Sequence, residues 1–476
     1  MIHWLELKRP PKLGLDVGIQ RRRWLGEFLK AFVVVFVGYL TMYLIRNNFK
    51  AASGSLKSEM GWTTTQLAAV GVAFSIAYGL GKTVLGYLVD GKNTKCVVSV
   101  LLTLSGVVVV FMGLGLAARG VPIAVFMILW GVNGVFQSVG GPAAYSTITR
   151  WTPRTVRGRW LGLWNVSHNI GGGLAGGVAL FGAQALFDGH VYGMFLFPAA
   201  IAVAVGVLGL FGGRDDPEEL GWDRAEVIFG EPVETDNTAA EGMSKWLIFR
   251  QYVLGNRWIW LLSISNVFVY VVRIGVDNWS VLYSQEHLGF SKADAVHTLF
   301  YFELGALVAS ACWGYVSDLV GGRRAAVAAA CLVATLLAIS AYRRATSVAE
   351  INVALFSLGA LIFGPQLLIG VSLVGFVPKR SVSVANGMTG TFGYLFGDAA
   401  AKVGLAAIAD PSQGGLHLLG VTLRGWGDTF VVLYAAAIAG VALLVVVAFG
   451  EERRLRALRR EALDVAPLAD DKRPPA

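Results

Sequence analysis

Long apolar runs are the feature that most constrains this chain. Runs of roughly 20 apolar residues occur about six times before residue 213 and about six times after residue 250, and each is long enough to cross a hydrocarbon core of about 30 Å as a helix. The composition agrees, with 55% hydrophobic residues, 15% charged residues and a mean hydropathy of +0.60. The sequence therefore predicts an all-α membrane protein with about twelve transmembrane helices.

The order of these runs predicts two six-helix bundles joined by a polar connection rich in Asp and Glu. We expect an N-terminal segment at 1–25, bundles at 26–213 and 251–450, a linker at 214–250 and a tail at 451–476. Residues 1–25 are basic but contain neither an apolar stretch nor a cleavage site. The first helix is thus expected to serve as the targeting signal itself.

The distribution of charge predicts the topology. Although the net charge is +9, the basic residues gather in alternate connections and at the two ends of the chain. Cytoplasmic loops of membrane proteins carry an excess of Lys and Arg. We therefore expect a multi-pass protein with both termini in the cytoplasm, in contact with a lipid bilayer and not with nucleic acid.

Three cysteines, Cys96, Cys312 and Cys331, fall in or beside apolar runs with no pairing or metal-ligand spacing. No metal, cofactor or disulfide is expected. No nucleophile constellation or nucleotide-binding loop stands outside the apolar runs, so the sequence does not predict an enzyme.

Two arginines lie at matching places in a duplicated sequence. Tyr43-x-x-Arg46 recurs as Tyr270-x-x-Arg273, each within a strongly apolar segment. An arginine in hydrocarbon costs about 2.5–3.5 kcal/mol on insertion scales, so a buried one is rarely incidental. The planar guanidinium donates two parallel hydrogen bonds to phosphate. The matched pair predicts one anion held between the two halves.

Each arginine also has an alternative without a ligand. Arg46 follows Lys30 by about 24 Å of helix, so it could lie beyond the midplane and extend outward to the membrane surface. Asp277 follows Arg273 by four residues, a spacing that permits a local ion pair.

A second repeated motif joins Gly86-x-x-x-Asp90 to Gly314-x-x-x-Asp318, each before a short basic turn. Its occurrence in both halves is typical of the major facilitator superfamily, whose substrate sites lie near mid-membrane between the repeats. We expect gating roles for Asp90, Asp318, Arg323 of the second turn and Glu303.

The resemblance extends to a particular family. GYLTMYLIRNNF (38–49), DGKNTK (90–95), YSTITRWTPR (145–154), GLWNVSHNIGGG (162–173), YVVRIGVDNWS (270–280) and FGPQLLIGVSLVGFVPK (363–379) resemble the bacterial organophosphate:phosphate antiporters, over roughly residues 10–460. The likeness is greatest to members that exchange hexose 6-phosphate for phosphate. It implies uptake of a sugar phosphate against inorganic phosphate across a bacterial inner membrane, with Arg46 and Arg273 as the phosphate clamp and His168 close to it.

Further polar residues in apolar runs are candidates for substrate contact: Lys82, Tyr43, Tyr270, Gln137, Asn165 and Tyr394. The tyrosines and amides could equally connect helices by hydrogen bonds, and His168 could be a hydrogen-bonded core residue. Lys82 could attract phosphate or bridge to Glu303 across the halves. Asp398 and Lys402 are expected to neutralise each other as an i,i+4 pair.

One departure from the family concerns specificity. Hexose-phosphate members carry an aspartate and a lysine where this chain has Asn386 and Thr389, so the resemblance leaves the preferred organophosphate open. A membrane sensor of sugar phosphate is the other function that the sequence allows. We expect a monomer.

Overall fold

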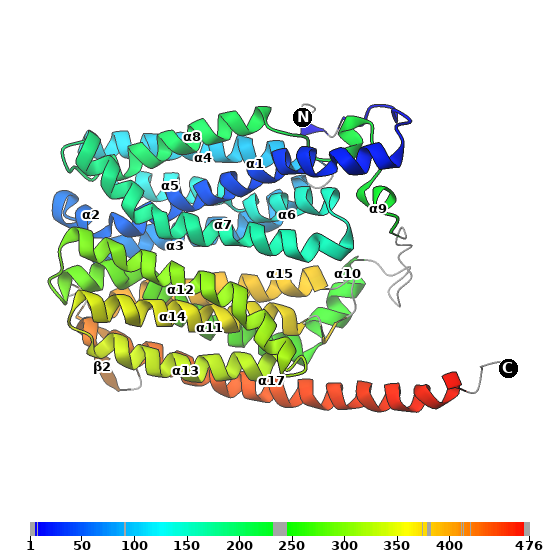
Figure 1. Cartoon of the computed structure of the whole chain (residues 1–476). Helices are drawn as coiled ribbons and strands as arrows, with labels where there is room; N and C mark the ends of the chain where they lie inside the picture. The colour runs from blue at the N-terminus through cyan, green and yellow to red at the C-terminus, as the bar shows by residue number, and fades with distance from the viewer. Residues whose placement is uncertain are drawn as a thin grey trace.

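The computed structural model describes residues 5–470, apart from residues 7, 90–91, 232–244, 374, 378–381, 411, 413 and 419. In this part of the chain, eleven helices are long and apolar enough to cross a membrane. A twelfth, α7 (Arg154–Phe181), has 28 residues but is less apolar, because polar residues and glycines fill its middle. Figure 1 shows the first six crossings above the last six. The predicted fold of two six-helix bundles is confirmed.

The N-terminal half begins with α1 (Val17–Ala51), and the short α2 (Ser53–Met60) leads into α3 (Thr64–Val89). Its other crossings are α4 (Thr94–Ala117), α5 (Ile123–Gln137) continued by α6 (Gly140–Trp151), α7 with the π-helical turn η2 (Gly182–Leu186), and α8 (Gly193–Phe211). The connection to the second half holds η3 (Pro217–Leu220), α9 (Ala225–Ile228), α10 (Lys245–Ile248) and η4 (Phe249–Leu254).

The C-terminal half contains α11 (Arg257–Glu286), α12 (Lys292–Leu319), α13 (Arg324–Arg344), α14 (Val348–Leu373) and α17 (Gly425–Asp470). The eleventh crossing of the chain, also in this half, consists of α15 (Val382–Phe392), η6 (Gly393–Asp398), η7 (Ala400–Gly404) and α16 (Leu405–Ala409). A small antiparallel hairpin of β1 (Leu416–Leu418) and β2 (Val421–Leu423), with Leu416 opposite Leu423, leads to α17.

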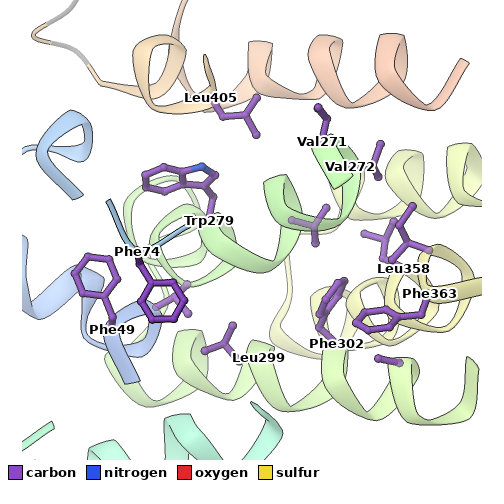
Figure 2. Close-up of a cluster of buried hydrophobic side chains, with 14 of the residues drawn as sticks. Phe49, Phe74, Val271, Val272, Trp279, Leu299, Phe302, Leu358, Phe363 and Leu405 are labelled. Carbon is purple, nitrogen blue, oxygen red and sulfur yellow. The ribbon is translucent and has the colours of Figure 1, made fainter. Parts of the chain in front are cut away.

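Helix α11 lies at the centre of the second half. Its residues from Val269 to Ser284 are all buried, and the side chains of Val271, Val272 and Trp279 point into the apolar cluster drawn in Figure 2. A helix that is buried all round must satisfy every polar side chain within the protein. Arg273 and Asp277 on this helix therefore need partners inside the fold or a ligand.

Close packing of α12 against α14 depends on two glycines. A Cβ on Gly305 would lie 2.0 Å from the carbonyl oxygen of Phe356, and one on Gly359 would lie 2.0 Å from that of Phe302. Small residues let membrane helices approach closely, which is how such helices associate without a hydrophobic driving force. The two positions admit no side chain.

The outer surface of the bundle is apolar. Phe211 is 82% exposed, Leu337 74% and Phe449 67%, and they lie on α8, α13 and α17. Exposing such large apolar side chains to water is unfavourable, whereas contact with lipid tails is favourable. This surface agrees with a protein that sits in a bilayer.

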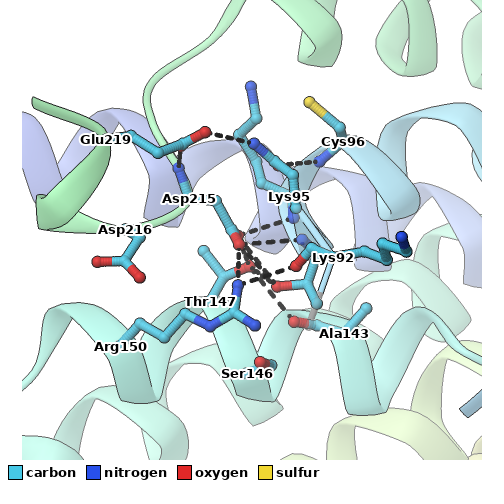
Figure 3. A network of polar contacts seen from close by, with 12 residues as sticks. Lys92, Lys95, Cys96, Ala143, Ser146, Thr147, Arg150, Asp215, Asp216 and Glu219 are labelled. Atoms are coloured by element: carbon cyan, nitrogen blue, oxygen red, sulfur yellow. Dashed lines mark hydrogen bonds and ion pairs between the residues drawn. The ribbon is translucent and has the colours of Figure 1, made fainter. Parts of the chain in front are cut away.

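The start of the connection between the halves is anchored to the first half. Asp215, 0% exposed, accepts hydrogen bonds from the backbone N–H of Thr94 (3.0 Å) and Lys95 (2.8 Å) and from the hydroxyl of Thr147 (2.5 Å), and it forms an ion pair with Arg150. Figure 3 shows these contacts converging on one carboxylate. The sequence predicted a polar linker from residue 214, but at least its first residues are built into the bundle.

Candidate substrate site between the two halves

A cavity lies between the halves and contains both repeat arginines. Arg46 of α1 and Arg273 of α11 line it, and α3, α5, α12, η6 and η7 complete its wall. Together with its open mouth, the cavity contains about 690 Å³ of unfilled space. The two repeat motifs thus meet in one site at the interface of the bundles, as the duplicated sequence predicts.

Aromatic rings hold the guanidinium of Arg46. Its Cζ lies 4.4 Å from the ring centre of Tyr78, 4.8 Å from that of Tyr43 and 4.9 Å from that of Phe74. Ring faces attract a cation without neutralising it, so the full positive charge stays available. The alternative in which Arg46 extends outward to the membrane surface is wrong, because its guanidinium lies among cavity residues.

Arg273 is 9% exposed, and its Cζ lies 4.2 Å from the ring centre of Phe363 and 5.8 Å from that of Tyr270. The local ion pair with Asp277 does not form within the described part of the chain. Asp277 instead accepts from Lys50 of the other half at 2.5 Å.

Neither arginine is neutralised. Among the described residues no ion pair involves Arg46 or Arg273, and the Nε atom of each is buried without a hydrogen-bond partner. A buried donor or charge without a partner carries a large desolvation cost. Two such groups facing one cavity are suited to bind an anionic ligand with several acceptor oxygens.

The tyrosines form a bridge across the halves. The ring centre of Tyr78 lies 5.4 Å from that of Tyr394 in the other half, and Tyr394 lies 5.2 Å from Tyr270. The ammonium of Lys82 lies 5.8 Å from the rings of both Tyr78 and Tyr394. Lys82 is exposed, so this side of the tyrosine bridge is the open side of the cavity.

Three further predicted residues lie in the N-terminal half, outside the enclosed part of the cavity. His168 is half-buried, with its ring centre 5.3 Å from that of Tyr43, and Asn165 lies one turn away on α7. Gln137 donates hydrogen bonds to Ser105 (3.3 Å) and Asn133 (3.1 Å) inside the bundle. The described contacts of Gln137 therefore match its alternative as a connection between helices.

Acidic residues line the cavity on the side away from Lys82. The Oε1 atom of Glu303, 3% exposed, accepts from the amide of Asn47 at 3.5 Å. No ion pair joins Glu303 to Lys82 among the described residues, because Lys82 lies on the open side instead. Asp398 and Lys402 form the predicted pair at 2.9 Å, and this prediction is confirmed.

The other candidates for gating and specificity lie elsewhere. The side chain of Asp318 is 70% exposed with Arg324 at 4.0 Å, and Arg323 pairs with Glu452 at 2.7 Å. Thr389 is buried against Ser263 at 3.1 Å. Asn386 is exposed and does not line the enclosed cavity. Asp90 falls outside the described residues.

Polar contacts close one end of the cavity. We name this the outer end, where α1 finishes, and the opposite end the inner end, following the orientation predicted from the basic loops. At the outer end Lys57 pairs with Glu286, and the backbone N–H of Thr65 donates to Asp410 at 2.9 Å. Lys402 donates to Ser75 of α3 at 2.6 Å. The protein is closed at its outer end and open beside Lys82.

Sequence reasoning missed several of these residues, Lys50 above all. Lys50 follows Arg46 by four residues, and Asp277 follows Arg273 by four, so the pair occupies one position of the repeat with opposite charges. That pattern could have predicted an ion pair between the two halves. Ser75, Asn47 and Asn278 gave none, because a single polar residue in an apolar run does not reveal which way it faces.

Known proteins share both the sequence and the fold. The Major Facilitator Superfamily profile matches residues 35–401. The hexose-6-phosphate:phosphate antiporter of Salmonella typhimurium is 47% identical, covering 96% of this chain and 98% of that protein. The glycerol-3-phosphate transporter of Bacillus subtilis is 32% identical, covering 90% and 93%.

Among solved structures, a bacterial homologue of the lysosomal transporter Spinster, inward-facing and unoccupied, matches with a TM-score of 0.64 at 15% identity. It covers 90% of this chain and 97% of that one, and at this identity the likeness concerns the fold alone. Relatives and fold are those of membrane transporters and not of enzymes. The chain belongs to the organophosphate:phosphate antiporters of the major facilitator superfamily.

Proposed function

We propose that this protein takes up hexose 6-phosphate in exchange for inorganic phosphate, by alternating access, with Arg46 and Arg273 clamping the phosphate. The observation that carries the proposal is the pair of unneutralised guanidinium groups, each with a buried Nε atom that has no partner, that face one cavity from the two halves. The 47% identical relative is named for this exchange. We further propose a bacterial inner membrane as the location, with both termini cytoplasmic.

The clamp explains why phosphate groups suit the site. A phosphate monoester carries about −1.5 to −2 charges near pH 7 and three acceptor oxygens. Two guanidinium groups match that charge and supply paired donors from opposite sides. Tyr43 and Tyr394 of the cavity lining provide hydroxyl groups beside them, and the ring of Tyr270 lies next to Arg273. Lys82 at the open side raises the local concentration of anions.

The same charges account for obligatory exchange. Two unit charges at about 8 Å repel by roughly 2 kcal/mol at an effective dielectric of 20, enough to slow closure of an empty site about thirtyfold. A bound dianion changes this repulsion into attraction. The loaded carrier therefore closes and reorients, while the empty carrier stays open, and no coupling sodium ion or proton is needed.

Reorientation also requires the outer end to open. The contacts of Lys50 with Asp277, Lys402 with Ser75 and Thr65 with Asp410 must then break. Each joins the two halves and none lies within one bundle. Together they define the closed outer end as one of two states between which the substrate would be carried.

The test uses purified protein in liposomes. Vesicles loaded with phosphate should take up labelled phosphate and labelled glucose 6-phosphate, and vesicles loaded with sulfate should take up neither. Uptake into vesicles without internal phosphate would contradict obligatory exchange. Binding of glucose 6-phosphate without any flux would contradict transport and favour the sensor function instead.

A further inference from the structure

A groove lies on the lipid-facing side of the junction between the two halves. It has an open volume of about 470 Å³, and its walls come from α7 and α8 of the first half and from α12 of the second. Leu174, Phe181 and Phe300 line it and are exposed, so it opens onto the apolar outer surface. Among the described residues, none lines both this groove and the cavity of Arg46 and Arg273. We call it the lateral groove.

Gly177 leaves space in the lateral groove that helix packing does not require. A Cβ on its neighbour Gly176 would lie 2.5 Å from Val296 of α12, so contact between the halves explains that glycine. A Cβ on Gly177 would meet no atom of the described residues within 4 Å. A glycine inside a helix costs about 0.8–1 kcal/mol relative to alanine. The small residue at position 177 therefore weakens the helix and keeps the groove open.

The lateral groove lies in the outer half of the membrane. Its residues on α12 run from His297 to Tyr301, five to nine positions after the helix begins at Lys292, which is about 7–14 Å along its axis. Its residues on α7 extend to Phe181, where that helix ends. Because a hydrocarbon core is about 30 Å thick, the groove is confined to the leaflet at the outer end.

We propose that the lateral groove binds one acyl chain of a phospholipid from the outer leaflet. Water does not fill an apolar hollow that faces hydrocarbon, and an empty hollow loses the dispersion contacts of its lining. An acyl chain held between three helices restores those contacts, whereas a chain on the open outer surface touches the protein on one side only. A bound chain contacts both halves of the protein at once.

Lys292 provides a contact for the phospholipid headgroup. It begins α12 beyond the outer end of the groove, and it forms no ion pair among the described residues. The nearby carboxylate of Glu59 already accepts from the backbone N–H of Val191 at 2.9 Å and lies 3.6 Å from His190. Lysine side chains near helix ends extend to the membrane surface, where basic groups between helices bind lipid phosphates.

The experiment places the purified protein in nanodiscs that contain phosphatidylglycerol with a photoactivatable diazirine in the middle of one acyl chain. Mass spectrometry measures the cross-linking yield on residues 297–301 of the groove and at Leu337, an exposed apolar residue of α13. As the fraction of probe rises, the yield in the groove should saturate, and the yield at Leu337 should increase in proportion. A proportional increase at both places would overturn the proposal.

Gly177→Leu places a side chain in the space of the acyl chain without striking a neighbour. The yield at 297–301 should fall at least about fivefold in this variant. Gly162→Leu is the matched control, since Gly162 lies on the same helix and also has open space around its Cβ position. It should keep the yield within about twofold. Equal yields in the two variants would overturn the proposal. If Gly177→Leu does not fold, the saturation measured on the unsubstituted protein decides.

Competition tests the headgroup contact. Unlabelled phosphatidylglycerol should lower the groove yield at concentrations at least about fivefold below those of diacylglycerol, which lacks the phosphate. Equal competition would contradict the assignment to a phospholipid and show that the groove accepts any acyl chain. None of these measurements depends on flux, so their outcome is independent of the proposed antiport.

Discussion

Lys50 and Asp277 occupy the same position in the two sequence repeats and meet in an ion pair of 2.5 Å across the halves. Each lies one helical turn beyond a repeat arginine, towards the outer end. The two bundles therefore carry the same charge at the arginine position of the repeat and opposite charges one helical turn further on. The first relationship places both guanidinium groups in one cavity, and the second joins the two halves at the outer end of that cavity.

Replacing Arg273 with lysine should reduce phosphate exchange by at least about a hundredfold. Lysine keeps the charge but loses the planar fork that donates two parallel hydrogen bonds, each worth about 1.5–3 kcal/mol with a charged partner. Labelled phosphate exchange in liposomes measures the effect. Arg456→Lys, an exposed arginine paired with Glu452, is the matched control and should be normal. Near-normal exchange in Arg273→Lys would refute the clamp.

Ser75→Ala should favour opening of the outer end. It removes the hydroxyl that Lys402 reaches at 2.6 Å and leaves the Lys402–Asp398 pair in place, at a cost of about 1–2 kcal/mol to the closed state. Spin labels at the exposed outer positions Ser58 and His287 report the separation by pulsed electron resonance. The fraction of molecules with a longer distance between the labels at Ser58 and His287 should rise.

The control for this shift is Ser340→Ala, which removes a comparable hydrogen bond of 2.8 Å to Tyr434 within the second half. Its distance distribution should match that of the unsubstituted protein. If Ser75→Ala and Ser340→Ala give the same distribution, the contact of Lys402 does not hold the outer end closed.

Asp410 should stabilise the fold independently of pH between 5 and 8. Burial opposes its ionisation, but hydrogen bonds from Thr65 and Ser412 outweigh that effect and lower the pKa of Asp410 from 3.8 to about 2. A carboxyl with a lowered pKa stabilises the folded state above its unfolded pKa, and the contribution is lost as pH falls towards 2.

The difference in melting temperature between the wild type and Asp410→Ala measures this contribution. It should be constant from pH 8 to about 5 and shrink as the pH falls below about 4. Asp294→Ala, which alters an exposed helix start beside Ser291, controls for general acid effects. A difference that already shrinks between pH 8 and 6 would contradict the assignment to Asp410.

Asp215→Ala should destabilise the protein by about 3–5 kcal/mol, because Arg150 and two backbone N–H groups would lose a buried acceptor. Thermal unfolding in detergent measures this loss. Asp223→Ala removes the partner of the exposed Lys12 and should cost at most about 1 kcal/mol. Equal effects of the two substitutions would show that the anchor of Figure 3 contributes little.

Periodic apolar runs were sufficient to predict the helices, and duplication was sufficient to predict that Arg46 and Arg273 share a site. Contacts between single polar residues could be predicted from the sequence less often. Lys402 was correctly paired with Asp398, four residues away, but its contact with Ser75 joins positions over 300 residues apart whose helical orientation no local pattern reveals. Asp215 was assigned to a linker because its neighbours are polar, although its partners lie in two other segments.

The glycines in the middle of α7 have a consequence for the speed of transport. A Cβ on Gly171 would lie 2.2 Å from the carbonyl oxygen of Leu40, and one on Gly172 would lie 2.6 Å from Glu303 of the other half. Along this seam the helix meets both neighbours with bare backbone, so no interlocking side chain must leave one hole and enter another when the bundles rock. Under the proposed alternating access, this contact between helices would offer little steric resistance to rocking, and the activation barrier would come from the polar contacts across the halves that must separate.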